Sequence, residues 1–183
     1  TDIGANLADA DLFLVDDGAG GTLRKSAASR IKTYVGANTP AFHAFLSGNQ
    51  TVGNNVETTA ACNTEGFDTD SAYNTSDYKF TPQVAGKYFI YANIVGQTGD
   101  YKLYKVDTRL YKNTTKIAES RDVSGNNSSF RSSESIAITV DMNGSSDFLI
   151  LKGLVDIHVD GTEQFAGDSA VSVTYFGGYK IIE

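Results

Sequence analysis

The clearest hydrophobic pattern in the chain lies in residues 88–95, where apolar side chains occupy both sets of alternating positions. The two sets are Tyr88, Ile90, Ala92 and Ile94, and Phe89, Tyr91, Asn93 and Val95. A strand that is apolar on both sides is typical of a sandwich core or of a contact between subunits. Pro82 excludes a helix through the residue before it, and Gly86 can open the strand because glycine tolerates backbone angles that other residues resist. The segment predicts a central β-strand.

Further segments with strand character continue to the end of the chain. Residues 101–112 alternate between polar and apolar side chains and predict a half-buried strand. Three more predicted strands, separated by clusters of Ser, Gly and Asn, are residues 116–120, 135–141 and 148–159. The last strand is expected at residues 170–182, where Gly177 and Gly178 indicate close backbone packing or a bulge. Helical repeats and β-α-β alternation are absent, so we predict an all-β antiparallel sandwich of about 8 to 10 strands.

The first 36 residues follow a different pattern. Residues 11–25 read as a β-hairpin with a glycine-rich turn at residues 17–21, and Ser26 is the predicted N-cap of a helix that runs to Val35. A module of this length rarely buries enough apolar surface to be stable alone. We therefore expect its apolar residues to contact other copies of the chain or a larger particle. The residues concerned are Leu12, Leu14, Ile31 and Tyr34.

Charges in this module separate on either side of the turn. The acidic residues that precede it are Asp2, Asp9, Asp11, Asp16 and Asp17, and the basic residues that follow it are Arg24, Lys25, Arg30 and Lys32. The two halves can therefore pair within one hairpin or between chains. The alternative is ordinary solvated charge, since an exposed ion pair contributes only about 0–1 kcal/mol.

Composition narrows the function classes. The chain has 183 residues, of which 40% are hydrophobic, enough for one globular domain and a small module. The formal net charge of −7 and the lack of a basic stripe exclude nucleic acid as a partner. No hydrophobic run is long enough for membrane insertion, and Thr1 does not begin a signal peptide, so we expect synthesis in the cytoplasm.

Residues 68–88 contain a spaced motif, Asp68-x4-Tyr73-x6-Phe80-x5-Gly86-x-Tyr88. This spacing resembles the signature of the globular heads of complement subcomponent q, which share a trimeric jelly roll with tumour necrosis factor. The family pattern also has aromatic residues at the positions of Cys62, Ile90 and Ala92, where this chain differs. The resemblance implies that residues 37–183 form a jelly-roll head, that the chain is a homotrimer, and that it binds rather than catalyses.

A second resemblance concerns residues 12–34, which look like a short N-terminal segment of tail-fibre and other appendage proteins of tailed bacteriophages. The matching stretches are Leu12–Thr22, Arg24-Lys25 and Ser29–Tyr34. Residues 40–47 and 67–82 are also similar to the first strands of phage heads of the complement type. This resemblance implies a virion protein whose residues 1–36 attach it to the particle and help to start trimerisation.

Candidates for catalysis are few. Gly167-Asp168-Ser169 matches a fragment of a serine-hydrolase motif, and His43 and His158 are the two histidines that a hydrolase would use as a base. The fragment lacks the flanking glycines of a nucleophile elbow and stands where a turn is expected before the last strand. Cys62 has no partner for an intrachain disulfide and reads as a buried apolar residue. We predict that the protein is not an enzyme.

No cofactor is expected, and calcium is the one metal for which the sequence leaves a binding site possible. Residues 68–79 are not an EF-hand, because Tyr73 and Lys79 occupy the positions that require a glycine and a bidentate acid. Heads of the resembled family sometimes hold calcium near the trimer apex. The loop acids that are candidates for such a site are Asp156, Asp160, Glu163 and Asp168. Clustered loop acids are more often simply solvated.

The sequence thus favours a homotrimeric virion protein, either a tail fibre or a decoration of capsid or tail. Its head would bind a glycan or protein on the host surface, and its N-terminus would dock on other virion proteins. The alternative is a secreted or surface bacterial adhesin or lectin-like module. A hydrolase is the third class and requires the Ser169 motif to be functional.

Overall fold

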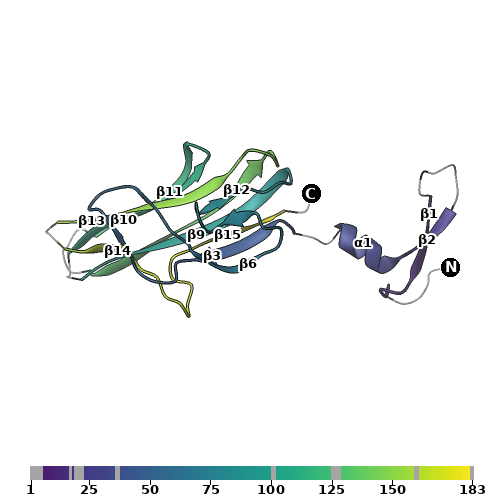
Figure 1. The fold of residues 1–183 in the computed structure, drawn as a ribbon, viewed down its shortest axis with the longest axis horizontal. Coiled ribbons are helices and arrows are strands. Elements are labelled where there is room, and N and C mark those ends of the chain that lie inside the picture. Colours follow the sequence, from purple (N-terminus) through teal and green to yellow (C-terminus); the bar gives the residue numbers. More distant parts are fainter. Residues whose placement is uncertain are drawn as a thin grey trace. The chain divides into compact units, whose positions relative to one another are not determined.

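The computed structural model describes residues 6–16, 18, 23–35, 38–99, 102–124, 129–158 and 161–181, without the side chains of residues 32–35 (Figure 1). The chain forms two compact units, which divide after residue 38. We call residues 1–38 the N-terminal unit and residues 39–181 the head, and each is described by itself.

The N-terminal unit is a hairpin followed by a helix. Strands β1 (Leu12–Asp16) and β2 (Leu23–Ala27) pair antiparallel, and α1 spans Ala28–Val35. In the register, Leu12 lies opposite Ala27 and Asp16 lies opposite Leu23. Most of the predicted turn at residues 17–21 falls outside the described residues.

The predicted N-cap of the helix is wrong. Ser26 belongs to β2, and the helix begins two residues later at Ala28. The backbone N–H groups of Ala28 and Ser29 donate to the carbonyl oxygens of Asp11 and Asp9, at 2.8 and 3.2 Å. These backbone acceptors satisfy amide groups that a side-chain cap would otherwise bond.

The head is an antiparallel sandwich of two sheets, which confirms the predicted fold class (Figure 1). Its strands are β3 (Ala41–Phe45), β4 (Gln50–Val52), β5 (Thr58–Thr59), β6 (Thr64–Asp68), β7 (Tyr73–Asn74), β8 (Lys79–Phe80), β9 (Gly86–Thr98), β10 (Leu103–Lys112), β11 (Thr115–Val123), β12 (Arg131–Met142), β13 (Leu149–Ile157), β14 (Glu163–Phe165) and β15 (Tyr175–Lys180). Eight of these described strands have five or more residues. The other five, with two or three residues each, are too short for an alternating pattern and raise the number above the prediction.

Strand β9 organises the seven-stranded sheet, whose order is β4-β14-β9-β15-β3-β6. On one side β9 pairs with β12 along nearly its whole length, and on the other it pairs with β15 and then β14. The six-stranded sheet has the order β11-β10-β13-β8-β7, with β5 also on β13. The expected last strand at residues 170–182 begins only at Tyr175, because the preceding residues form a loop.

The five motif residues lie in and beside one end of the core. Tyr73, Phe80 and Tyr88 are buried, and the ring of Phe80 stacks on Phe42 with 4.2 Å between centroids. Asp68 is a turn residue: its carboxylate accepts hydrogen bonds from the backbone N–H groups of Ala72 and Tyr73, at 3.1 and 2.8 Å. Gly86 has φ of +139°, which L side chains rarely adopt, and it opens β9. The motif therefore specifies the aromatic core and its turns.

Candidate assembly surface and binding end

The outer side of the seven-stranded sheet carries a concentration of aromatic rings. We call this surface the aromatic face; its residues are His43, Phe45, Phe67, Phe89, Tyr91, Tyr175 and Tyr179. In β9 the alternate residues Tyr88, Ile90 and Ala92 are buried in the core, so Phe89 and Tyr91 point to the opposite side. The rings are half-buried or exposed, and Phe67 is 50% exposed.

Two rows of residues across the sheet bring these rings together. One row runs across four strands from Phe67 through His43 and Gly177 to Tyr91. The ring of His43 lies 5.9 Å from that of Tyr91 and 6.2 Å from that of Phe67. A second row pairs Tyr179 with Phe89, whose ring centroids are 5.6 Å apart. Because the strands are distant in sequence, the face exists only once the register is formed.

Gly177 makes room for the centre of the aromatic face. A Cβ atom at this position would lie 2.4–2.6 Å from ring atoms and the hydroxyl of Tyr91, well inside ordinary contact distance. On the core side, a Cβ atom at Gly178 would lie 2.5 Å from Cδ1 of Ile90 and 2.8 Å from the carbonyl oxygen of Phe89. The close packing predicted at these two glycines is present, and it affects both sides of the sheet.

His43 is the titratable centre of this surface. Its Nε2 atom lies 3.1 Å from Oγ of Ser172, and its Nδ1 atom lies 3.3 Å from the hydroxyl of Tyr91. Burial lowers the pKa of His43, since the charged imidazolium loses hydration among the rings. At neutral pH the face is therefore uncharged at its centre.

Strand β12 continues the aromatic face with small side chains. Its outward residues lie opposite the outward residues of β9, are exposed, and comprise Ser133, Ser135, Ala137 and Thr139. The amide of Asn93 joins this strand to the loop before β15, because it accepts from Ser135 Oγ at 2.8 Å and donates to the carbonyl of Val173 at 2.7 Å. The large rings of the aromatic face and the small side chains of β12 beside them give this side of the head raised and recessed parts.

The end of the head opposite the Pro40–Lys180 contact brings together described residues at the ends of β9, β10, β11, β12 and β13. The strand register places Gly86 at one end of β9 and Thr98 at the other, a span of about 40 Å. At the Thr98 end, backbone hydrogen bonds join residues beside these strands: Thr98 N–H donates to Phe130 O at 2.9 Å, and His158 N–H donates to Lys102 O at 3.4 Å. We call this the distal end.

The distal end exposes apolar and aromatic side chains. Phe130 is 51% exposed and Val123 is 49% exposed. The exposed ring of His158 lies 4.2 Å from the ring of Tyr104. Loops with such residues on a rigid sandwich are typical positions for recognition.

A network of ion pairs covers the outer side of the six-stranded sheet. Asp107 is fully buried, and Arg121 donates to both of its carboxylate oxygens, at 2.7 and 2.8 Å. Arg109 donates to Asp107 at 2.6 Å and to Glu57 at 2.7 Å. Burial by itself would raise the pKa of Asp107, but the two guanidinium groups hold that pKa below its usual value. The network joins β10, β11 and the segment before β5.

The residues considered for catalysis do not form a site. Asp168 accepts hydrogen bonds from the backbone N–H groups of Ala170 and Val171, as expected for a turn. The contacts described for His43 and His158 involve neither Asp168 nor Ser169. Cys62 is buried, which raises the pKa of its thiol to about 12.

The calcium candidates are placed only in part. Asp156 pairs with Lys105 at 3.3 Å, Glu163 is buried in β14, and Asp168 forms the turn. Asp160 lies outside the described residues. Within the described part of the chain, no three His, Cys, Asp or Glu side chains are grouped so that they could hold a metal ion.

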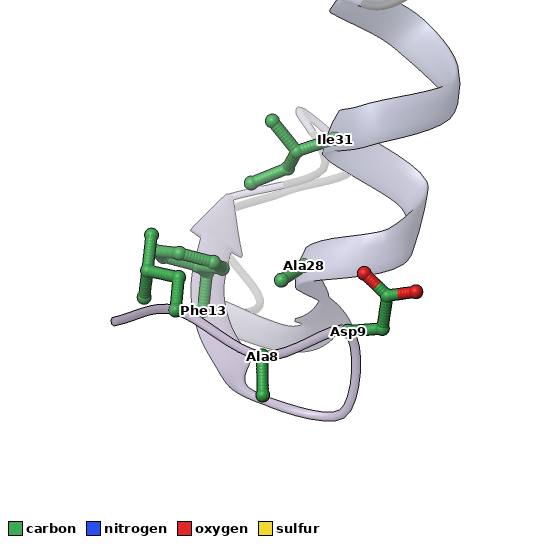
Figure 2. Close-up of a pocket in the computed structure, with 6 residues that line it drawn as sticks. Ala8, Asp9, Phe13, Ala28 and Ile31 are labelled. Carbon is green, nitrogen blue, oxygen red and sulfur yellow. The ribbon is translucent and has the colours of Figure 1, made fainter. Parts of the chain in front are cut away.

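The N-terminal unit exposes the apolar residues predicted for attachment. Leu12 and Leu14 are 60% and 69% exposed, and Ile31 is 42% exposed. Ile31 borders a pocket of about 240 Å³ that Phe13 and Ala28 also line (Figure 2). The side chain of Tyr34 lies outside the described residues. No described helix has the length and apolar character to span a membrane.

Comparison with solved structures identifies the fold of the head. The globular domain of zebrafish complement 1qA matches with a TM-score of 0.56 and 14% identity, over 78% of this chain and 96% of that one. The head has a jelly-roll fold of the complement C1q and tumour necrosis factor type. Eiger TNF from S. frugiperda matches with a TM-score of 0.56 and 11% identity, over 77% of this chain and 91% of that one.

A third structure of this type is murine APRIL, at pH 5.0, with a TM-score of 0.55 and 10% identity, over 77% of this chain and 98% of that one. No protein-family description and no curated protein matches the sequence. The similarity to C1q/TNF-like heads inferred from the motif is confirmed at the level of the fold.

Proposed function

We propose that this chain is a homotrimeric structural protein of a bacteriophage particle, either a fibre or a decoration of capsid or tail. It is made in the cytoplasm of the host bacterium and joins the virion. The N-terminal unit docks on other virion proteins, and the distal end of the head binds a glycan or protein on the host surface. Domains with this jelly-roll fold commonly form homotrimers and are typically binding modules rather than enzymes.

The aromatic face is the main observation in support of the proposed trimer. Seven rings, among them Phe67 and Tyr179, lie half-buried or exposed on one side of a sheet whose other side already forms the core. A sandwich needs only one apolar side for its own core, and a contiguous apolar surface on a soluble domain marks an interaction site. Closed cyclic symmetry buries such a surface on every copy.

The proposed place in the virion and the proposed binding to the host surface rest on different observations. The sequence resemblance of residues 12–34 to phage appendage proteins supports the virion. The same resemblance and the exposed Ile31 of α1 support docking by the N-terminal unit, and the exposed Phe130 and Tyr104–His158 pair support recognition by the distal end.

Purified particles test the proposal. We expect mass spectrometry to find the protein in gradient-purified virions from a host that carries its gene. A chain shortened to begin at Asn38 should remain soluble and trimeric, because its head keeps its own core. It should be missing from particles, because it lacks the N-terminal unit. A variant with the exposed Arg30 changed to Ala is the matched control and should still be incorporated. Recovery of the full chain in the cell envelope, and not in particles, would support a bacterial adhesin instead.

A further inference from the structure

The hairpin of the N-terminal unit has one covered and one bare side. Phe13 lines the pocket together with Ala28 and Ile31 of α1, so the helix lies over the side to which Phe13 points (Figure 2). Leu12 and Leu14 alternate with Phe13 and point to the other side. Leu23 is opposite Asp16 in the register and shares that side.

The bare side combines three exposed leucines with one acidic and one basic residue, Asp16 and Lys25. Leu12, Leu14 and Leu23 are 60%, 69% and 64% exposed. Burying a leucine side chain fully contributes about 1.5–3 kcal/mol. Three such residues on a two-stranded sheet, which is at best marginally stable alone, require a covering partner.

The edges of the hairpin are also open. Among the described residues, β1 pairs with β2 and with no further strand, so each strand has one edge without a ladder partner. Such an edge is a template for another strand. A further strand added at each edge would extend the hydrogen-bonded ladder of the hairpin.

Charge selects which edges can meet. Strand β1 ends with Asp16 and is preceded by Asp11, whereas β2 carries Arg24 and Lys25. Contact of β1 with β1, or of β2 with β2, would bring like charges together, which is destabilising. Contact of β1 with β2 brings opposite charges together. Such a head-to-tail contact uses different surfaces on the two chains, so it either closes into a ring or continues as a filament.

We propose that three N-terminal units pair head-to-tail, with β1 of each chain beside β2 of the next, in a closed six-stranded ring. The leucines of the bare sides fill its interior, and α1 lies outside. Asp16 and Lys25 lie on the same side as the leucines, so Asp16 of one chain faces Lys25 of its neighbour inside the ring, beside the leucines. The partner is thus a second copy of this chain, and the number three rests on the proposed trimer of the head.

Hydrogen exchange on the full-length chain tests the ring. Mass spectrometry should show that amides of both strands exchange roughly tenfold or more slowly than in an unstructured peptide. Asp16→Lys or Lys25→Asp should each remove this protection, and the double reversal should restore it. Arg30→Asp changes the charge by the same amount on the helix and should leave the protection intact. Light scattering on the same samples reports the assembly of the head.

A cross-link shows whether the pairing is between chains. Chains labelled with ¹⁵N and unlabelled chains are refolded together and treated with a carbodiimide, and we expect an Asp16–Lys25 amide that joins labelled to unlabelled peptide. Fast exchange of both strands in a chain that scatters as a trimer would overturn the ring and leave the proposed trimer of the head intact. A chain that scatters as a monomer would overturn both. Protection that appears only inside particles would assign the bare side to a particle protein and also overturn the ring.

Discussion

Alanine at Gly178 and alanine at Gly177 should affect different properties of the protein, because the two residues face opposite sides of one sheet. At Gly178, the new Cβ atom would lie 2.5 Å from Cδ1 of Ile90, a fully buried residue. Ordinary carbon contacts begin near about 3.5 Å, so Ile90 must move by about 1 Å within a packed core. Overpacking of this kind costs about 1–3 kcal/mol. Lower entropy of the unfolded chain offsets about 0.5–1 kcal/mol of that cost.

At Gly177, the Cβ atom would instead meet the far end of the Tyr91 side chain. In a single head this ring can turn toward solvent, so folding should change little. In the trimer the ring is part of the contact, so its displacement should weaken assembly. The Tyr91→Ala variant provides the control: added to it, Gly177→Ala should have no further effect, because the clash is gone.

Thermal melting and sedimentation equilibrium separate the two effects. We expect Gly178→Ala to lower the melting temperature at every protein concentration, by about 2–4 °C for each kcal/mol of net destabilisation. Gly177→Ala should shift the sedimentation equilibrium toward monomer, and its melting temperature should fall most at low concentration. An unchanged sedimentation equilibrium for Gly177→Ala would refute the reasoning that the Tyr91 ring belongs to the contact between chains.

Three further predictions concern the core, the ion pairs and the imidazole. Tyr88→Ala should destabilise the head by about 3–5 kcal/mol in denaturant unfolding because a large buried ring is lost, whereas Tyr88→Phe, which removes only the 2.7 Å hydrogen bond to the Val84 carbonyl, should cost about 0.5–1.5 kcal/mol. Because the folded-state pKa of Asp107 is lowered, this residue adds to the free energy of unfolding above about pH 4, and the added stability is lost as pH falls through the lower folded pKa. Asp107→Asn should therefore lower the free energy of unfolding by about 1–3 kcal/mol at pH 7 and flatten this part of the acid unfolding curve. Burial also lowers the pKa of His43, so protonation penalises the folded state as pH falls below about 6.5, and His43→Gln should reduce the loss of melting temperature between pH 7 and pH 5.

The parts of the fold that are regular over many residues could be predicted from the sequence. The alternation at residues 88–95 lies within β9, and the motif residues Tyr73, Phe80 and Tyr88 lie in the core. Strands of two residues, such as β7 and β8, have no period and leave no signal. The start of α1 was not predictable from a capping residue, because the acceptors are backbone carbonyls of a segment that tertiary structure brings close.

The candidate site was less accessible to sequence analysis. Its rings come from β3, β6, β9 and β15, and only the pairing register aligns Phe67, His43 and Tyr91 in one row. The one local signal was the second apolar side of β9, which indicated a core or a subunit contact without distinguishing them. Gly177 and Gly178 signalled close packing, but the ring that covers Gly177 depends on a neighbouring strand.

Light scattering coupled to gel filtration tests the trimer through the aromatic face most directly. The wild-type chain should elute with three times its chain mass of 19.6 kDa at micromolar concentration. Phe89→Asp places a charge within the face and should give a folded species of single chain mass. Val123→Asp places the same charge at an exposed position on the other sheet and should remain trimeric. A wild-type chain that elutes with the mass of one chain would contradict the trimer, and a Phe89→Asp variant that stays trimeric would place the contact elsewhere.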